Sequence, residues 1–77
     1  MKPLSYRILL TEEPEGGYTV TVPMLPGCVS FGNTITEAKR MAVEAIELYI
    51  ESLAAHQEEI PTEEHTFETT VFLEQHA

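Results

Sequence analysis

The side chains in this sequence that could do acid–base, nucleophilic or metal chemistry are its glutamates, three histidines and one cysteine. All thirteen acidic residues are Glu, against four Lys and Arg. Hydrolysis by paired carboxylates needs two of them at a fixed separation in a cleft. Here the glutamates gather in turns and on one side of an expected helix. Since a hydrolytic Mg²⁺ site would need carboxylates clustered on the sheet, we expect no catalytic residues and no enzyme activity.

The histidines and the cysteine are too scattered to form a metal site. His56, His65 and His76 fall at the expected end of a helix, in a loop and in the tail, far in sequence from Cys28. A zinc site needs several such ligands brought together. Cys28 has no neighbouring His or basic residue that would lower the pKa of its thiol, so we expect it to be buried and inert. The sequence also lacks a nucleophile elbow and a phosphate-binding loop, and it predicts no metal and no cofactor.

The formal net charge of −9 limits the class of partner. Nucleic-acid binding depends on neutralising phosphates with Lys and Arg, so we expect no direct binding of DNA or RNA. A strongly acidic domain attracts basic partners, although simple solubility also explains such a charge. No apolar run approaches the ~18 residues of a membrane span, and the N-terminus does not resemble a signal peptide. With a single cysteine, these features predict a cytoplasmic protein with no membrane partner.

Period-two alternation of apolar and polar residues predicts four strands. They cover residues 4–11, 18–22, 28–31 and 66–73. The first three are joined by short turns and should form an antiparallel meander. Between the third and fourth, Thr34 and Glu37 form a capping box that starts a helix running to about His56. A strand after such a helix returns most simply parallel to the first strand, at the sheet edge.

The predicted fold is therefore α+β, with βββαβ order. It has a four-stranded mixed sheet and one long helix packed on one face. At 77 residues the chain is one small domain, residues 1–77, and we expect no C-terminal DNA-binding domain.

A rigid corner separates the second and third strands. Pro23 ends the strand because it has no N–H to donate, and Leu25 is forced into extended backbone by the proline after it. Pro26 and Gly27 form a strong turn dipeptide. Because an ordinary hairpin needs only two polar residues here, we expect the shape of this corner to matter.

The helix has a wide apolar arc and an acidic side. A stripe of small and large apolar residues recurs at helical spacing: Ala38, Ala42, Ala45, Ile46, Tyr49 and Leu53. Met41 and Leu48 widen this arc, and they either deepen the core or contact another subunit. On the opposite side lie Glu44, Glu47 and Glu51, which most simply form a solvated face. A second acidic cluster, Glu12, Glu13 and Glu15, lies in the first turn.

Several motifs, in order and with consistent spacing, resemble the HicB-like antitoxin family. They are residues 16–23 (GGYTVTVP), 25–29 (LPGCV), 32–38 (GNTITEA), 45–50 (AIELYI) and 60–61 (IP). The resemblance implies a partial RNase H-like domain without the catalytic acids. It also implies an antitoxin that binds and masks a HicA toxin, a small basic RNA-cleaving protein. In the family an acidic residue commonly stands where this chain has Met24, and longer members usually carry a DNA-binding domain.

Two hypotheses from different classes follow. In the first, an acidic surface covers the basic RNA-binding face of a toxin, with candidate contacts at Glu12, Glu13, Glu15, Glu44, Glu47 and Glu51. In the second, the chain is an orphan structural or regulatory domain that only self-associates, as a dimer or larger, through Met41 and Leu48.

Overall fold

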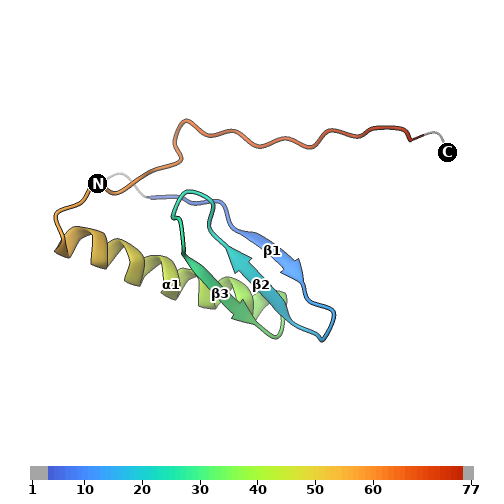
Figure 1. The fold of residues 1–77 in the computed structure, drawn as a ribbon, viewed down its shortest axis with the longest axis horizontal. Helices are drawn as coiled ribbons and strands as arrows, with labels where there is room; N and C mark the ends of the chain where they lie inside the picture. Colours follow the sequence, from blue (N-terminus) through green and yellow to red (C-terminus); the bar gives the residue numbers. More distant parts are fainter. Residues whose placement is uncertain (1–3, 76–77) are drawn as a thin grey trace.

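The structure, a computed structural model, describes residues 4–75 and has three strands and one helix (Figure 1). The strands are β1 (Leu9–Glu12), β2 (Tyr18–Thr21) and β3 (Val29–Gly32), and they form one antiparallel sheet in the order β1-β2-β3. The helix α1 (Ile35–Ala55) lies across one face of this sheet, mainly against β2 and β3. The α+β class, the meander and the single long helix are confirmed. His76 lies outside the described residues.

The strand register explains which face is buried. Val20 pairs with Leu10 on one side and with Ser30 on the other. Residues directly opposite one another in a sheet point to the same face. Val20 is fully buried and packs against Ala38 and Ala42 of α1, with Leu10 at the margin of this cluster. The even-numbered positions of β1 and β2 therefore face the helix, as the alternation predicts.

A second core cluster forms around the corner between β2 and β3. Val22, Leu25 and Cys28 are buried together, and Tyr49 of α1 packs against them. The corner is closed by three backbone hydrogen bonds: Val22 N–H to the Cys28 carbonyl (3.2 Å), Leu25 N–H to Val22 (3.0 Å) and Cys28 N–H to Leu25 (2.9 Å). Gly27 takes φ +84°, a left-handed conformation that glycine adopts at little cost. The corner thus delivers Leu25, with no exposed surface, into the core.

The corner is also tied to the helix. The hydroxyl of Tyr49 donates a hydrogen bond of 2.7 Å to the Pro26 carbonyl oxygen. Pro23 and Pro26 are exposed, whereas Met24 between them is half-buried. The prolines therefore stiffen the outside of the corner while the side chains between them turn inward.

The start of α1 follows the capping box, with one difference. The Glu37 amide donates to the Thr34 hydroxyl oxygen at 3.1 Å, as predicted. In a capping box the Glu37 carboxylate would accept from the backbone N–H of Thr34, but here it accepts from the backbone N–H of Asn33 at 2.9 Å, one residue earlier. The helix ends with His56 as its C-cap.

Gly32 lets β3 and α1 approach closely. A Cβ on this buried glycine would overlap the backbone N and Cα of Ala38 and lie 2.8 Å from the carbonyl carbon of Glu37. The helix therefore starts directly against the end of the strand that precedes it.

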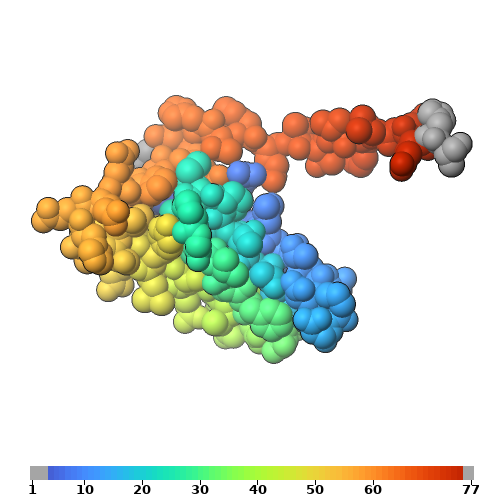
Figure 2. Space-filling view, viewed as in Figure 1, coloured from blue at the N-terminus to red at the C-terminus, as the bar shows by residue number. Residues whose placement is uncertain are grey.

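The predicted four-stranded sheet is not observed. Among residues 4–75 the sheet has three strands, and residues 66–73 are extended but pair with none of them. The first strand is also shorter than predicted, because residues 4–8 lie outside β1. The C-terminal segment, residues 66–73, stands away from the body of the molecule (Figure 2, orange to red).

Candidate partner-binding surfaces

Three of the four acidic residues of α1 lie together on one surface, whereas Glu37 belongs to the cap at the start of the helix. Glu44, Glu47 and Glu51 are exposed and line a shallow depression of about 340 Å³ together with Leu48. Leu48 is 67% exposed, which is high for so large an apolar side chain. An apolar centre with a charged rim is the usual anatomy of a protein interface. We refer to these four residues as the helix surface.

The acidic residues of the first turn lie elsewhere. The β1–β2 turn is at one end of the sheet, whereas the helix surface lies along α1 (Figure 1). Glu12 and Glu15 are exposed, but the Glu13 carboxylate accepts a 2.7 Å hydrogen bond from the Thr19 hydroxyl. Glu13 therefore helps to hold the hairpin, and the six candidate glutamates divide into two separate groups.

The two residues proposed for self-association differ in their exposure. Met41 is half-buried, whereas Leu48 points into solvent. Val43, which was not among the candidates, is 55% exposed on the same helix.

A third surface, the sheet face opposite α1, was not singled out from the sequence. Leu9, Thr21 and Val29 form one row across this face, and Thr11, Thr19 and Phe31 form the next. Leu9, Val29 and Phe31 are 44%, 57% and 47% exposed. We refer to these three residues as the open sheet face. Their odd-numbered positions in the alternating strands were the signal that could have identified this face.

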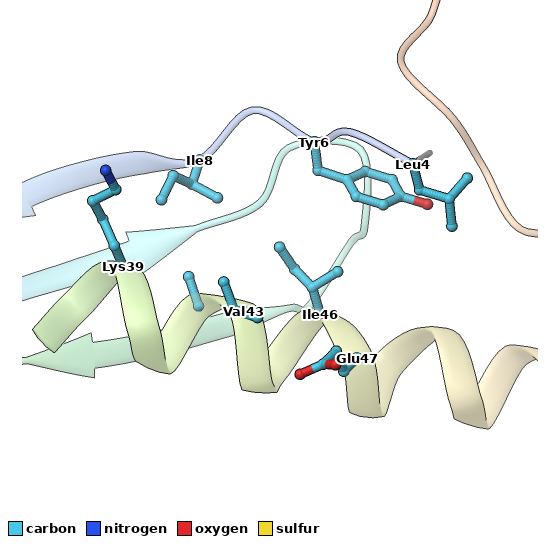
Figure 3. Close-up of a pocket in the computed structure, with 8 residues that line it drawn as sticks. Leu4, Tyr6, Ile8, Lys39, Val43, Ile46 and Glu47 are labelled. Atoms are coloured by element: carbon cyan, nitrogen blue, oxygen red, sulfur yellow. The ribbon is translucent and has the colours of Figure 1, made fainter. Parts of the chain in front are cut away.

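A groove separates the N-terminal segment from α1 (Figure 3). It has a volume of about 450 Å³, and its lining is mostly apolar: Leu4, Tyr6, Ile8, Ala42, Val43 and Ile46, with Lys39 and Glu47. In Figure 3, Tyr6 and Ile8 point toward the helix, and Val43 and Ile46 point toward them. The groove exists because α1 packs mainly on β2 and β3, which leaves the β1 side of the helix uncovered.

An ion pair joins the N-terminal segment to the loop after the helix. Arg7 Nε lies 3.1 Å from Glu63 Oε1, and the Arg7 backbone N–H donates to the other carboxylate oxygen of Glu63. Glu63 is 7% exposed, and the Tyr6 hydroxyl donates to the Pro61 carbonyl oxygen at 2.6 Å. Sequence reasoning missed this anchor, because residues 56–64 have the polar composition of a free loop.

Two ionisable side chains near these elements have raised pKa values. Burial raises the pKa of the Tyr6 hydroxyl, and the negative charge of Glu63 adds to the effect. Burial also raises the pKa of the Cys28 thiol, which is 5% exposed. A protonated, buried thiol is a poor nucleophile, which agrees with the structural role expected for Cys28.

The described residues contain no group of three or more His, Cys, Asp or Glu side chains arranged to hold a metal ion. Within residues 4–75, no helix has both the length and the apolar character needed to cross a bilayer.

Comparison with known families identifies the domain. The sequence profile of a family described as "HicB_like antitoxin of bacterial toxin-antitoxin system" matches residues 6–75. The chain belongs to this family. The match begins at Tyr6 and spans the meander, the corner, α1 and the C-terminal segment.

Individual relatives of this HicB-like chain come from bacteria, archaea and a phage. A UPF0150 protein of Synechocystis sp. is 50% identical over 60 residues, which are 78% of this chain and 76% of the relative. A UPF0150 protein of Thermoplasma acidophilum is 47% identical over 58 residues, 75% of this chain and 84% of the relative. An uncharacterised 14.9 kDa protein of Haemophilus phage HP1 is 46% identical over 50 residues, 65% of this chain and 38% of the relative.

Family membership supports an antitoxin-type function for this chain and suggests a regulatory rather than a catalytic role. It implies in general that a toxin is the partner. The geometry adds three candidate surfaces for that partner: the helix surface, the β1–β2 turn and the open sheet face.

Proposed function

We propose that this protein is an antitoxin that binds a small basic RNA-cleaving toxin of the HicA type and covers its RNA-binding face. The match to the antitoxin family over residues 6–75 carries the proposal. The net charge of −9 supports it, because a surface that binds RNA phosphates is itself cationic and attracts an acidic protein. Inhibition would require only occlusion, with no bond made or broken.

The helix surface is our first choice for the toxin contact. Glu44, Glu47 and Glu51 are exposed around Leu48, so a toxin could bury an apolar centre while its basic side chains meet the acidic rim. Glu12, at the end of β1, and Glu15, in the turn that follows, would add long-range attraction. Glu13 is the weakest of the six candidates, because Thr19 already holds its carboxylate.

We infer a cytoplasmic antitoxin that does not bind nucleic acid directly and whose domain is of the partial RNase H-like type. The small number of basic side chains supports the absence of nucleic-acid binding.

Co-expression with the products of the neighbouring genes tests the proposal. We expect a small basic neighbour to co-purify with this chain and its toxicity to be relieved. The double variant E47K/E51K should weaken that complex by roughly tenfold or more, and high salt should weaken the wild-type complex. A neighbour that is toxic but neither binds nor is neutralised would contradict the proposal.

The matched control is E58K/E59K, which changes the net charge by the same amount at two exposed loop positions. If the helix surface is the contact, this control retains most of the binding. Equal losses in both variants would mean that net charge alone attracts the toxin and that its contact lies elsewhere.

The second candidate is an orphan regulatory domain that only self-associates. The exposed apolar side chains of α1, Val43 and Leu48, favour it. A tight oligomer that L48S dissociates, together with no toxic neighbour, would support this candidate over the antitoxin.

A further inference from the structure

The C-terminal segment has the sequence of a strand but pairs with no strand among residues 4–75. Near its base, Glu68 Oε1 lies 3.5 Å from Arg7 Nη1 of the same chain. The alternation of the segment places Phe67, Val71 and Leu73 on one side and Phe72 on the other. These side chains are 91%, 74%, 88% and 89% exposed, in that order. Soluble proteins rarely leave such a contiguous apolar surface in water, so a strand with apolar side chains on both sides points to an uncompleted contact.

The sheet has a free edge that suits such a strand. The order β1-β2-β3 leaves the outer side of β1 without a neighbouring strand in residues 4–75. The groove between residues 4–8 and α1 opens beside this edge. A strand laid along β1 would direct alternate side chains into the apolar lining of the groove, which includes Tyr6, Val43 and Ile46 (Figure 3).

The segment of the same chain starts near this edge but does not follow it. Residues 61–63 are fixed to Tyr6 and Arg7, and a turn follows in which the Thr66 N–H donates to the Glu63 carbonyl oxygen at 3.0 Å. Beyond the turn the segment leads away from the sheet (Figures 1 and 2). The anchor therefore holds the base of the segment and presents its apolar part outward.

We propose that residues 66–73 of one copy add as a strand to the β1 edge of a second copy. Residues 66–73 of the second copy add in the same way to the β1 edge of the first. The outer sides of both β1 and β3 are unpaired among residues 4–75, but the groove opens beside β1. Each chain thus has one donor segment and one groove-flanked edge, so a pair related by a two-fold axis uses both donors and both edges and closes. Eight extended residues span roughly 26 Å, about twice the length of the four-residue strand β1. Since Arg7 already donates its backbone N–H to Glu63 of its own chain, backbone pairing would be confined to Leu9–Glu12, and the rest of the segment would lie over the groove.

The charges also favour a second copy of this chain over a basic protein as the occupant. Residues 66–73 contain one charged residue, Glu68, and the groove lining contains one cation, Lys39, and one anion, Glu47. The donor and the acceptor are thus nearly uncharged and mostly apolar, whereas the net charge of −9 resides elsewhere. Because two copies repel each other overall, the dimer should become tighter as salt is raised.

Sedimentation velocity of the full chain, over a range of micromolar concentrations, tests the proposal. We expect a dimer for the wild type and for L48S. V71P should raise the dimer Kd by roughly tenfold or more, because proline removes a backbone donor from the added strand. Circular dichroism should show the same helix content in V71P, since this side chain contacts no core cluster.

F67S/F72S provides a second variant in which the backbone donors remain. It should also dissociate the dimer. A wild-type monomer, or V71P and F67S/F72S proteins that remain dimeric, would overturn the proposal. Dissociation by L48S alone would assign the contact to the helix surface instead.

Strand exchange also has a direct signature in nuclear magnetic resonance. In a dimer mixed from isotope-labelled and unlabelled wild-type chains, we expect contacts between the Phe67 or Phe72 ring and the Val43 or Ile46 methyl groups of the other copy. Contacts confined to one chain would mean that the segment folds back on its own sheet, and the proposal would be wrong.

Discussion

Strand β2 and the C-terminal segment have similar sequences but opposite environments. Both are rich in β-branched and aromatic residues that alternate with polar ones, although the alternation in the C-terminal segment ends in the apolar run Val71, Phe72 and Leu73. In β2, Val20 has no exposed surface, whereas Val71 in the C-terminal segment is 74% exposed. Alternation therefore specifies a strand with distinct faces but not the neighbour that pairs with it.

Connection length explains much of the difference. β2 is joined to β1 by a tight turn, in which Gly16 N–H donates to the Glu13 carbonyl oxygen at 2.9 Å. Gly16 and Gly17 take φ +106° and +84°, which suits such a turn. The C-terminal segment instead follows a loop that is fixed by Glu63. Local contacts thus bring β2 to its partners, whereas the position of the C-terminal segment depends on a distant anchor.

The largest expected difference between the folded body and the C-terminal segment is the loss of unfolding free energy when one large side chain is removed from each. L25A should lower the free energy of unfolding by about 3 kcal/mol, because it removes buried atoms and leaves a cavity at the corner. F67A should change it by less than about 0.5 kcal/mol at concentrations where the chain is monomeric. Urea unfolding followed by circular dichroism measures both, and a comparable loss for F67A would show that the C-terminal segment packs on its own body.

The close approach of β3 to α1 offers a second test of the body. G32A should cost about 2 kcal/mol, because the added Cβ overlaps the backbone of Ala38 and neither element can move freely. S30A in the same strand, which adds no atoms, is the control and should cost less. If the melting temperature of G32A equals that of the wild type, β3 and α1 can move apart without a loss of stability.

The Arg7–Glu63 anchor joins the N-terminal segment to the base of the C-terminal segment. E63Q removes the charge that holds Arg7, so the base of the C-terminal segment should loosen while the core clusters stay intact. Hydrogen exchange should show the Arg7 amide exchanging roughly tenfold faster and the Val20 amide unchanged. Equal acceleration at both amides would indicate that the anchor supports the whole fold.

The smallest expected effect is a loss of stability at alkaline pH. Folding raises the pKa of Cys28 above its ordinary value of 9.0 and that of Tyr6 above 10.0, so the folded state favours the protonated forms. The stability from these groups is complete below the ordinary pKa values and is lost as the pH rises through the raised ones. Unfolding free energies should therefore fall above about pH 9, and C28V should flatten the first part of this decline.

Much of the body was predictable because its determinants are close in sequence. The capping box fixes the start of α1, and period-two alternation assigns Val20 to the helix side of the sheet. The glutamates of the helix surface could also be grouped from helical spacing alone. That these glutamates surround one exposed leucine follows only from the side-chain positions, and whether a toxin binds there stays a prediction.

The anchor and the fourth strand were not predictable, because both depend on residues far apart in the chain. Arg7 and Glu63 are separated by 56 positions, and no local pattern signals that their side chains meet. The fourth strand was assigned to the sheet on its alternation, but pairing needs a neighbour at the right place as well as a suitable sequence.

The sequence alone was enough to predict the first three strands, the helix and its buried side, the corner and the family, but not the fate of the fourth predicted strand. These properties follow from backbone preferences and from periodicity, which act over a few residues. Only the tertiary structure decided that β1 keeps a free edge, that a groove opens beside it and that the C-terminal apolar side chains face outward. Those outcomes depend on how α1 seats on the sheet and on which distant groups hold the chain, and neither is encoded locally.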